Sequence, residues 1–138
     1  MIAYLDASVV LRLVLNERNR IKEWTRMTDA VASALTEVEC LRTLDRLARS
    51  GALEATEVAS RREAVYRLLE GVEVVELTRS VLRRASESFA TPLGTLDAIH
   101  LSTALLWRDA RDADLVMATH DKALGVAARS VGLRVIGV

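Results

Sequence analysis

The sequence is poor in cysteine and histidine, which limits the chemistry that it can support. Cys40 is the single cysteine among 138 residues, so neither an internal disulfide bond nor a cysteine-based zinc site can form. The two histidines are 20 residues apart and no H-E-x-x-H motif is present, so a histidine-based zinc site is not indicated. This cysteine usage is typical of a reducing compartment, and we expect the protein to be cytoplasmic.

Proline, glycine and long apolar runs are also scarce. One proline and six glycines leave no room for a flexible linker, and no internal repeat is visible, so we expect one domain over residues 1–138. The longest uncharged run, Ala98–Trp107, is half of the roughly 20 residues that a membrane helix needs. No basic stretch followed by a long apolar one opens the chain, and we expect no secretory signal.

Neither sign of charge is in excess. The 19 basic and 19 acidic residues cancel, and no basic run exceeds two residues, so a nucleic-acid partner cannot be inferred from bulk charge. Apolar residues, by contrast, make up 51% of the chain, and the mean hydropathy is +0.18. These values exclude a disordered chain and indicate a packed core.

Short apolar runs alternate with helical patterns along the whole chain. Strands are expected at Ile2–Leu5, Val31–Leu35, Val72–Leu77, Leu115–Thr119 and Arg134–Val138. Helices are expected at Ser8–Glu17, Ile21–Met27, Thr36–Ser50, Glu54–Leu69, Arg79–Phe89, Leu96–Arg108 and Ala123–Val131. Strands that alternate with helices favour parallel pairing with helices on both faces. The sequence therefore predicts a three-layer α/β/α sandwich with a short, mostly parallel central sheet of about five strands.

Acidic residues follow several of these strands. Asp6 comes directly after the first strand, Glu39 lies near the start of the helix after the second, and Asp121 follows the fourth. Asp97 stands at the start of a helix, after the only Pro-Leu-Gly turn. Ligands of such folds bind outside the carboxyl ends of the strands, so we expect the four carboxylates to face one crevice.

Carboxylates that converge repel one another unless a cation joins them. Oxygen ligands without histidine or cysteine suit Mg²⁺ or Mn²⁺. Such a cation lowers the pKa of a bound water and stabilises charge on a phosphoryl group. The pattern therefore predicts a metal-dependent hydrolase that acts on phosphodiesters.

Each acid also has an ordinary structural interpretation. Asp6 and Asp121 could cap the helices that follow them, and Asp97 could complement a helix dipole. Thr36 and Glu39 match a capping box. Glu37 remains a competitor of Glu39, because the two lie about 200° apart around the helix and only one can face the crevice.

Two hydroxyl residues and two histidines flank the acids. Ser8 and Thr119 could orient a carboxylate or a metal-bound water, or could serve as a helix cap and a strand residue. His100 stands one helical turn after Asp97, where it could lie at the pocket rim or be a buried neighbour. His120 precedes Asp121, and the sequence leaves the roles of both histidines open.

Four segments together resemble a known family. They are Asp6-Ala7-Ser8, Glu39 after the second strand, Leu96-Asp97-Ala98-Ile99-His100-Leu101-Ser102-Thr103-Ala104, and Thr119-His120-Asp121. In this order and spacing they resemble the PIN-domain ribonucleases, and the size resembles VapC-type toxins of bacterial type II toxin–antitoxin pairs. The resemblance extends over the whole chain.

The resemblance implies a function and a set of roles. It implies Mg²⁺- or Mn²⁺-dependent cleavage of RNA, with the family's acidic quartet at Asp6, Glu39, Asp97 and Asp121. Asp6 and Asp97 would be the principal metal ligands, Glu39 and Asp121 would complete the site or position the attacking water, and Ser8 and Thr119 would support them. It also implies a cognate VapB-type antitoxin, and a homodimer or a heterotetramer or octamer with that antitoxin.

An acidic pocket that admits an RNA phosphate needs cations at its rim, and Arg12, Arg42 and Arg46 are the candidates. Their alternative interpretation is a solvated helix face. A non-catalytic PIN-like binding module is a rival reading of the whole chain. A haloacid-dehalogenase-like phosphatase or a receiver domain is a weaker one, because Ser8 stands where the phosphatase needs an Asp and Lys122 does not end a strand.

Overall fold

The computed structural model describes residues 1–138 and is built around one five-stranded sheet. The strands are β1 (Ile2–Leu5), β2 (Asp29–Ser33), β3 (Glu73–Val75), β4 (Leu115–Ala118) and β5 (Arg134–Ile136), in the order β3-β2-β1-β4-β5. Every neighbouring pair is parallel. The predicted α/β class is confirmed, and the sheet is parallel throughout.

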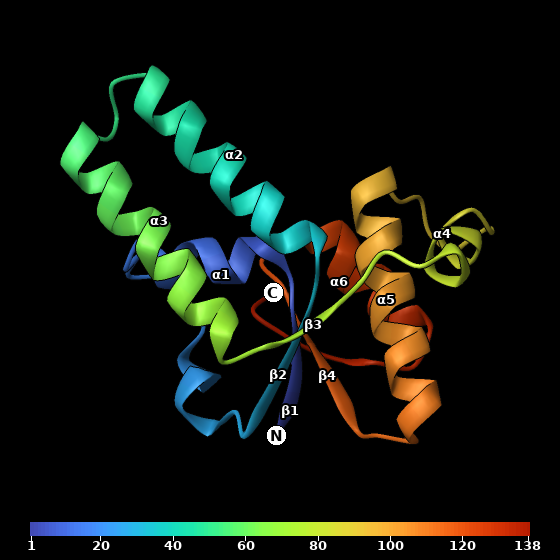
Figure 1. The fold of residues 1–138 in the computed structure, drawn as a ribbon. Coiled ribbons are helices and arrows are strands. Elements are labelled where there is room, and N and C mark those ends of the chain that lie inside the picture. The colour runs from blue at the N-terminus through green and yellow to red at the C-terminus, as the bar shows by residue number, and fades with distance from the viewer.

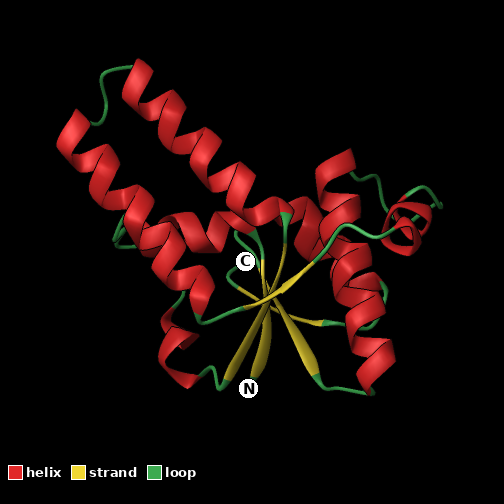
Figure 2. Ribbon diagram, in the orientation of Figure 1, coloured by secondary structure: helices red, strands yellow, loops and turns green.

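Helices cover both faces of this sheet (Figures 1 and 2). They are α1 (Ala7–Val14), the 3₁₀ helix η1 (Lys22–Arg26), α2 (Leu35–Arg49), α3 (Ala55–Glu70), α4 (Arg79–Ala85), α5 (Thr95–Arg111) and α6 (Lys122–Ser130). Helices α2 and α3 lie side by side and extend beyond the sheet as a hairpin (Figure 1). None of these helices combines the length and the apolar composition of a membrane span.

Alternation along β1 divides the core into two clusters. Ala3 and Leu5 pack on one face with residues of α1, α2 and α3, whereas Tyr4 packs on the other with residues of α5 and α6. Successive strand residues point to opposite faces, so a central strand contributes to both layers. Val65 on α3 is fully buried and belongs to the first of these clusters.

Several predicted boundaries were wrong, each for a local reason. Strand β2 begins at Asp29 rather than Val31, because polar Asp29 pairs with Ile2 in the ladder although it is exposed. The strand ends at Ser33, whose hydroxyl accepts a hydrogen bond from the Leu35 amide at 3.1 Å and turns the chain into α2. Helix α1 ends at Val14, before Asn16, which has a φ of 55°.

Strands β3 and β5 are shorter than the predicted Val72–Leu77 and Arg134–Val138, and the other differences concern the helices. Helix α4 stops at Ala85 rather than Phe89, and α5 runs from Thr95 to Arg111 before Asp112, which has a φ of 48°, ends it. The helix expected at Ile21–Met27 is the 3₁₀ helix η1. A left-handed residue ends a helix wherever it falls, and an apolar pattern does not show its position.

Candidate active site

The carboxyl ends of β1 and β4 bring Asp6 and Asp121 together. The two strands are neighbours, with Leu5 opposite Ala118, and the Asp6 amide donates to the Ala118 carbonyl at 3.0 Å. Asp121 directly precedes α6. Two residues far apart in sequence therefore meet at one edge of the sheet, as the rule for parallel sheets predicts.

Asp6 is held by hydrogen bonds that position its carboxylate. The residue is only 5% exposed, and Oδ2 accepts from Ser8 Oγ at 2.5 Å and from Thr119 Oγ1 at 2.9 Å. It makes no side-chain cap of α1, so the capping interpretation was wrong for this residue. The geometry leaves Oδ1 without a hydrogen bond.

The two hydroxyls also join the loops that carry the acids. Ser8 Oγ accepts from the His120 amide at 3.0 Å, and Thr119 Oγ1 accepts from the Asp121 amide at 3.0 Å. Each hydroxyl thus donates to Asp6 and accepts from the β4–α6 loop. Asp121 does cap α6, through Oδ1 and the Leu124 amide at 2.9 Å, so the capping interpretation holds for this acid.

Glu39 reaches the same place from α2. Its Oε1 lies 2.5 Å from His100 Nε2, and that nitrogen lies 3.7 Å from Asp6 Oδ1. Glu37 makes no side-chain hydrogen bond or ion pair with the residues of this cluster. The capping box was wrong, because Thr36 lies within α2, which begins at Leu35, and its buried Oγ1 has no hydrogen-bond partner.

His100 lies beneath the carboxylates rather than at the pocket rim. It is fully buried, and Nδ1 lies 2.9 Å from the Tyr4 hydroxyl. Burial alone would lower the pKa of His100, but the hydrogen bond that it donates to Glu39 and the charges of Asp6, Glu39 and Asp97 together raise the pKa above its ordinary value. Its spacing from Asp97 pointed to the site, although its burial could not be read from the spacing.

Asp97 completes the acidic group from the first turn of α5. Burial raises its pKa to about 6, helped by the negative charges of Asp121, Asp6 and Glu39 and opposed by His100. The negative charges of the other three acids therefore make ionisation of this carboxyl less favourable. Asp114, by contrast, pairs with Arg134 at 2.7 Å at the opposite end of β4.

Cys40, next to Glu39, is an inert thiol. Burial raises its pKa to about 12, and the charges of Glu39 and Asp6 add to this effect. A thiol of this kind stays protonated and is a poor nucleophile. The cluster therefore offers carboxylate and hydroxyl oxygens rather than a reactive thiolate.

Carboxylate oxygens are the type of atom that a hard divalent cation binds, although they are not arranged here as a complete coordination shell. No three side chains of His, Cys, Asp or Glu converge tightly enough to form a metal centre by themselves. The charges of Asp121, Asp6 and Glu39 add to burial in raising the pKa of Asp97, and a bound cation would relieve this part of the effect. Carboxylates without thiolates are the donor set that Mg²⁺ and Mn²⁺ prefer.

The three candidate arginines lie outside this cluster. Arg12 turns toward the end of α1, with Nε 3.7 Å from Glu17, and Arg42 lies 3.7 Å from Asp45. Arg46 donates to Thr43 Oγ1 at 3.0 Å. Arg42 and Arg46 follow Glu39 by three and seven residues, which places them on its side of α2, one and two turns beyond it.

A comparison with known families identifies the fold. The model of the PIN domain matches residues 3–129. The chain belongs to the PIN domain family. The resemblance of its motifs to PIN domains is thereby confirmed, and the haloacid-dehalogenase and receiver alternatives were wrong.

Two curated relatives of this PIN domain come from Mycobacterium tuberculosis. Ribonuclease VapC46 (strain ATCC 25618 / H37Rv) is 31% identical over 137 residues, which cover 96% of this chain and 95% of that protein. Ribonuclease VapC47 (strain CDC 1551 / Oshkosh) is 32% identical over 108 residues, which cover 73% of each. Within the PIN domains, the chain therefore belongs with the VapC-type proteins, as the motifs indicated.

Two solved structures share the fold of this PIN domain. A toxin–antitoxin complex from Klebsiella pneumoniae matches with a TM-score of 0.68 at 14% identity, over 99% of this chain and 96% of that one. PAE2754 from Pyrobaculum aerophilum matches with a TM-score of 0.61 at 23% identity, over 98% and 88%. At these identities the likeness concerns the fold alone.

Proposed function

We propose that this PIN domain is an endoribonuclease toxin, which cleaves RNA phosphodiester bonds with Mg²⁺ or Mn²⁺ and is neutralised by an antitoxin. One observation carries the proposal: Asp6 and Asp121 follow neighbouring strands, His100 Nε2 lies between Glu39 and Asp6, and the charges of these acids raise the pKa of Asp97. Relatives of the same length are named ribonucleases, which supports this reading of the acids. We further propose one domain over residues 1–138 and a cytoplasmic location.

The chemistry divides between the acids and the hydroxyls. Asp6 and Asp97 would be the principal ligands of the cation, and Glu39 and Asp121 would complete the site or position the attacking water. When bound there, a divalent cation supplies an activated water and stabilises negative charge on the phosphoryl group. Ser8 and Thr119 would hold Asp6 in place, because both hydroxyls donate to its Oδ2.

Arginines would hold the RNA backbone beside this acidic site. Arg42 and Arg46 are the stronger candidates, because both are exposed on α2 and lie on the side of Glu39. A guanidinium there would offset the repulsion between phosphate and carboxylates. Arg12 is the weaker candidate, because its guanidinium points toward Glu17 and Asn19.

The experiment that tests this function is induced expression in a bacterial host, with the wild type beside Asp6→Asn and RNA 5′ ends mapped in both. We expect growth arrest and a few discrete new 5′ ends in the wild type alone. Arrest by both proteins, or no new ends in the wild type, would contradict cleavage and favour a non-catalytic binding module. Circular dichroism of both purified proteins controls for loss of the fold.

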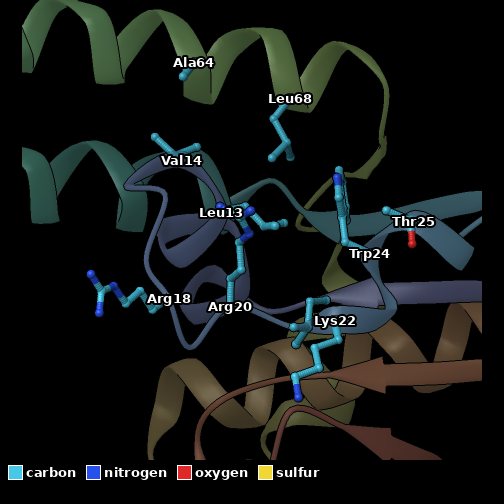
Figure 3. A pocket seen from close by; sticks show the side chains of 10 residues that line it. Leu13, Val14, Arg18, Arg20, Lys22, Trp24, Thr25, Ala64 and Leu68 are labelled. Carbon is cyan, nitrogen blue, oxygen red and sulfur yellow. The ribbon is translucent and has the colours of Figure 1, made fainter.

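A cavity outside the acidic site supports the proposal that an antitoxin binds this protein. It measures about 700 Å³ and is lined by apolar side chains of α1, η1 and α3 together with Arg18, Arg20 and Lys22. Figure 3 shows Leu68 reaching from α3 toward Leu13, with the Trp24 ring beside them. No acidic side chain lines this cavity, so it suits a protein segment that combines apolar and acidic side chains.

A homodimer would use a different surface. Val74 on the edge strand β3, Leu77 after it and Leu82 on α4 are all exposed large apolar residues. Apolar side chains on an edge strand and its neighbouring helix are typical of a contact with a second copy. Light scattering of the wild type and Leu82→Glu tests this assignment, which predicts a dimer for the wild type and a monomer for the variant.

A further inference from the structure

His100 joins the core to the acidic site through both of its ring nitrogens. The side chain is 0% exposed, with Nδ1 2.9 Å from the Tyr4 hydroxyl and Nε2 2.5 Å from Glu39 Oε1. In the neutral imidazole, Nε2 donates to the carboxylate, which only accepts, and Nδ1 accepts from the tyrosine. A chain of hydrogen bonds therefore runs from β1 through α5 to α2.

We propose that His100 is a positioning residue, which holds Glu39 beside Asp6 so that its carboxylate takes part in binding the cation. This inference rests on the proposed function, because it assigns a role within that site. A glutamate on a helix surface otherwise samples several rotamers, and ordering it costs entropy. The imidazole restricts that freedom before any cation arrives, since Nε2 lies next to Glu39 and 3.7 Å from Asp6 Oδ1.

The same contact separates Glu39 from its neighbour Glu37. Both acids lie near the start of α2, and the sequence could not choose between them. Only Glu39 has the imidazole as a partner. The selection of one acid therefore comes from α5 and β1, which are distant in sequence, and not from α2 itself.

Tyr4 fixes the orientation of the imidazole. Its ring is fully buried and meets the imidazole edge-on, with the centroids 5.9 Å apart and the planes at 74°. The aromatic packing remains when the hydroxyl is removed, so Tyr4→Phe isolates the hydrogen bond to Nδ1. The hydroxyl should act on metal binding only through His100.

The test measures Mn²⁺ binding by calorimetry on purified proteins, with RNA cleavage as a second readout. We expect His100→Leu to weaken Mn²⁺ binding by about 10- to 100-fold, as is typical when the partner of a metal ligand is lost. His100→Gln should weaken it less, because the amide can still donate to Glu39. Tyr4→Phe should weaken it by about 3-fold, the effect of one hydrogen bond.

A matched control comes from the same helix. Ser102 is fully buried on α5 and its hydroxyl has no partner in the structure, so Ser102→Ala should leave Mn²⁺ binding unchanged. Thermal unfolding of each variant ensures that affinities are compared between folded proteins. If His100→Leu does not fold, the Mn²⁺ affinities of His100→Gln and Tyr4→Phe, compared with that of the wild type, test the positioning role in its place.

A double-mutant cycle with Glu39→Gln distinguishes positioning from general packing. If His100 acts through Glu39, adding His100→Leu to Glu39→Gln should cost no further Mn²⁺ affinity. The same loss in both backgrounds, or wild-type affinity in His100→Leu, would overturn the positioning role and leave the proposed function intact. A wild type that binds no Mn²⁺ and cleaves no RNA would overturn both.

Discussion

The two ends of α1 carry opposite chemistry. At the first end, Asp6 is buried and held by two hydroxyls among other acids. At the other end, about 12 Å away by helix rise, Leu13 and Val14 open on a cavity with three cations and no acid. The net charge of zero therefore conceals a separation of charge: the acidic end suits a cation, and the basic end suits an acidic partner.

The largest expected effect is the loss of RNA cleavage when a carboxylate at the acidic end is neutralised. Asp6→Asn should reduce RNA cleavage by roughly 100-fold or more, because a principal metal ligand loses its charge. Antitoxin affinity should stay near that of the wild type, since the cavity lies at the other end of α1. Cleavage assays and calorimetry on the same protein check both. Loss of antitoxin binding in this variant would show that the two ends are not independent.

A substitution in the cavity at the basic end should instead weaken antitoxin binding. Leu68→Asp should weaken antitoxin binding by about 30-fold or more, because it places a charge among apolar contacts and cations matched to acidic side chains. Cleavage by the free protein should be unchanged. Tyr66→Asp is the matched control, since Tyr66 is on the same helix but 43% exposed and outside the cavity. Equal losses in both variants would exclude the cavity as the docking site.

A third change acts between the two ends. Gly137 has a φ of 100°, and a Cβ there would overlap the Thr119 carbonyl and lie 3.2 Å from Ile21 Cγ2. Gly51, with a φ of 80°, has open space instead. Gly51→Ala should cost about 1 kcal/mol of unfolding free energy for the backbone alone, and Gly137→Ala about 1 to 2 kcal/mol more.

Urea denaturation of the two variants measures this difference. Because Thr119 belongs to the acidic end and Ile21 to the cavity, Gly137→Ala should also reduce both cleavage and antitoxin binding. Equal destabilisation of the two variants would mean that the segment near Gly137 adapts without cost.

The smallest effect concerns pH. The raised pKa of Asp97, about 6 against 3.8 in an unfolded chain, means that the folded protein binds an extra proton between these values. Its contribution to stability is therefore largest below about pH 4 and is lost as the pH rises through 6. Asp97→Asn should then be more stable than the wild type at pH 8, by at most about 1 kcal/mol because the group is screened by solvent, and equal to it at pH 4.

Thermal unfolding at several pH values checks this prediction. Added Mn²⁺ should stabilise the wild type at pH 8 more than Asp97→Asn, because the cation relieves the repulsion that the variant lacks. A variant that is less stable than the wild type at pH 8 would contradict the origin assigned to the pKa shift.

The sequence predicts the acidic end well because one rule about parallel sheets suffices. Asp6 and Asp121 each follow a strand, and strands β1 and β4 are neighbours, so both acids reach one edge. The order of the strands in the sheet, by contrast, depends on packing across the whole chain. The burial of His100 and its contacts with Tyr4 and Glu39 depend on that order, and helical spacing alone does not reveal them.

The cavity could not be predicted for a related reason. Its walls come from α1, the segment that leads to η1, and Ala64 and Leu68 on α3, which lie far apart in the sequence. Arg18, Arg20 and Lys22 form no basic run, and each alone suggests only a solvated surface. The capping patterns of Asp6 and Thr36 gave wrong predictions for two reasons. The Asp6 side chain accepts a tertiary hydrogen bond from Thr119 in place of a helix cap. Helix α2 begins before Thr36, so this residue cannot be its cap.

The decisive experiment for the metal site is RNA cleavage by the purified protein after chelation of divalent ions, with Mn²⁺ then restored in steps. We expect no cleavage by the chelated wild type, recovery as Mn²⁺ rises, and no recovery in Asp6→Asn at any concentration tested. Cleavage that persists after chelation, or that recovers equally in Asp6→Asn, would contradict the claim that these carboxylates hold the ion that cleaves RNA.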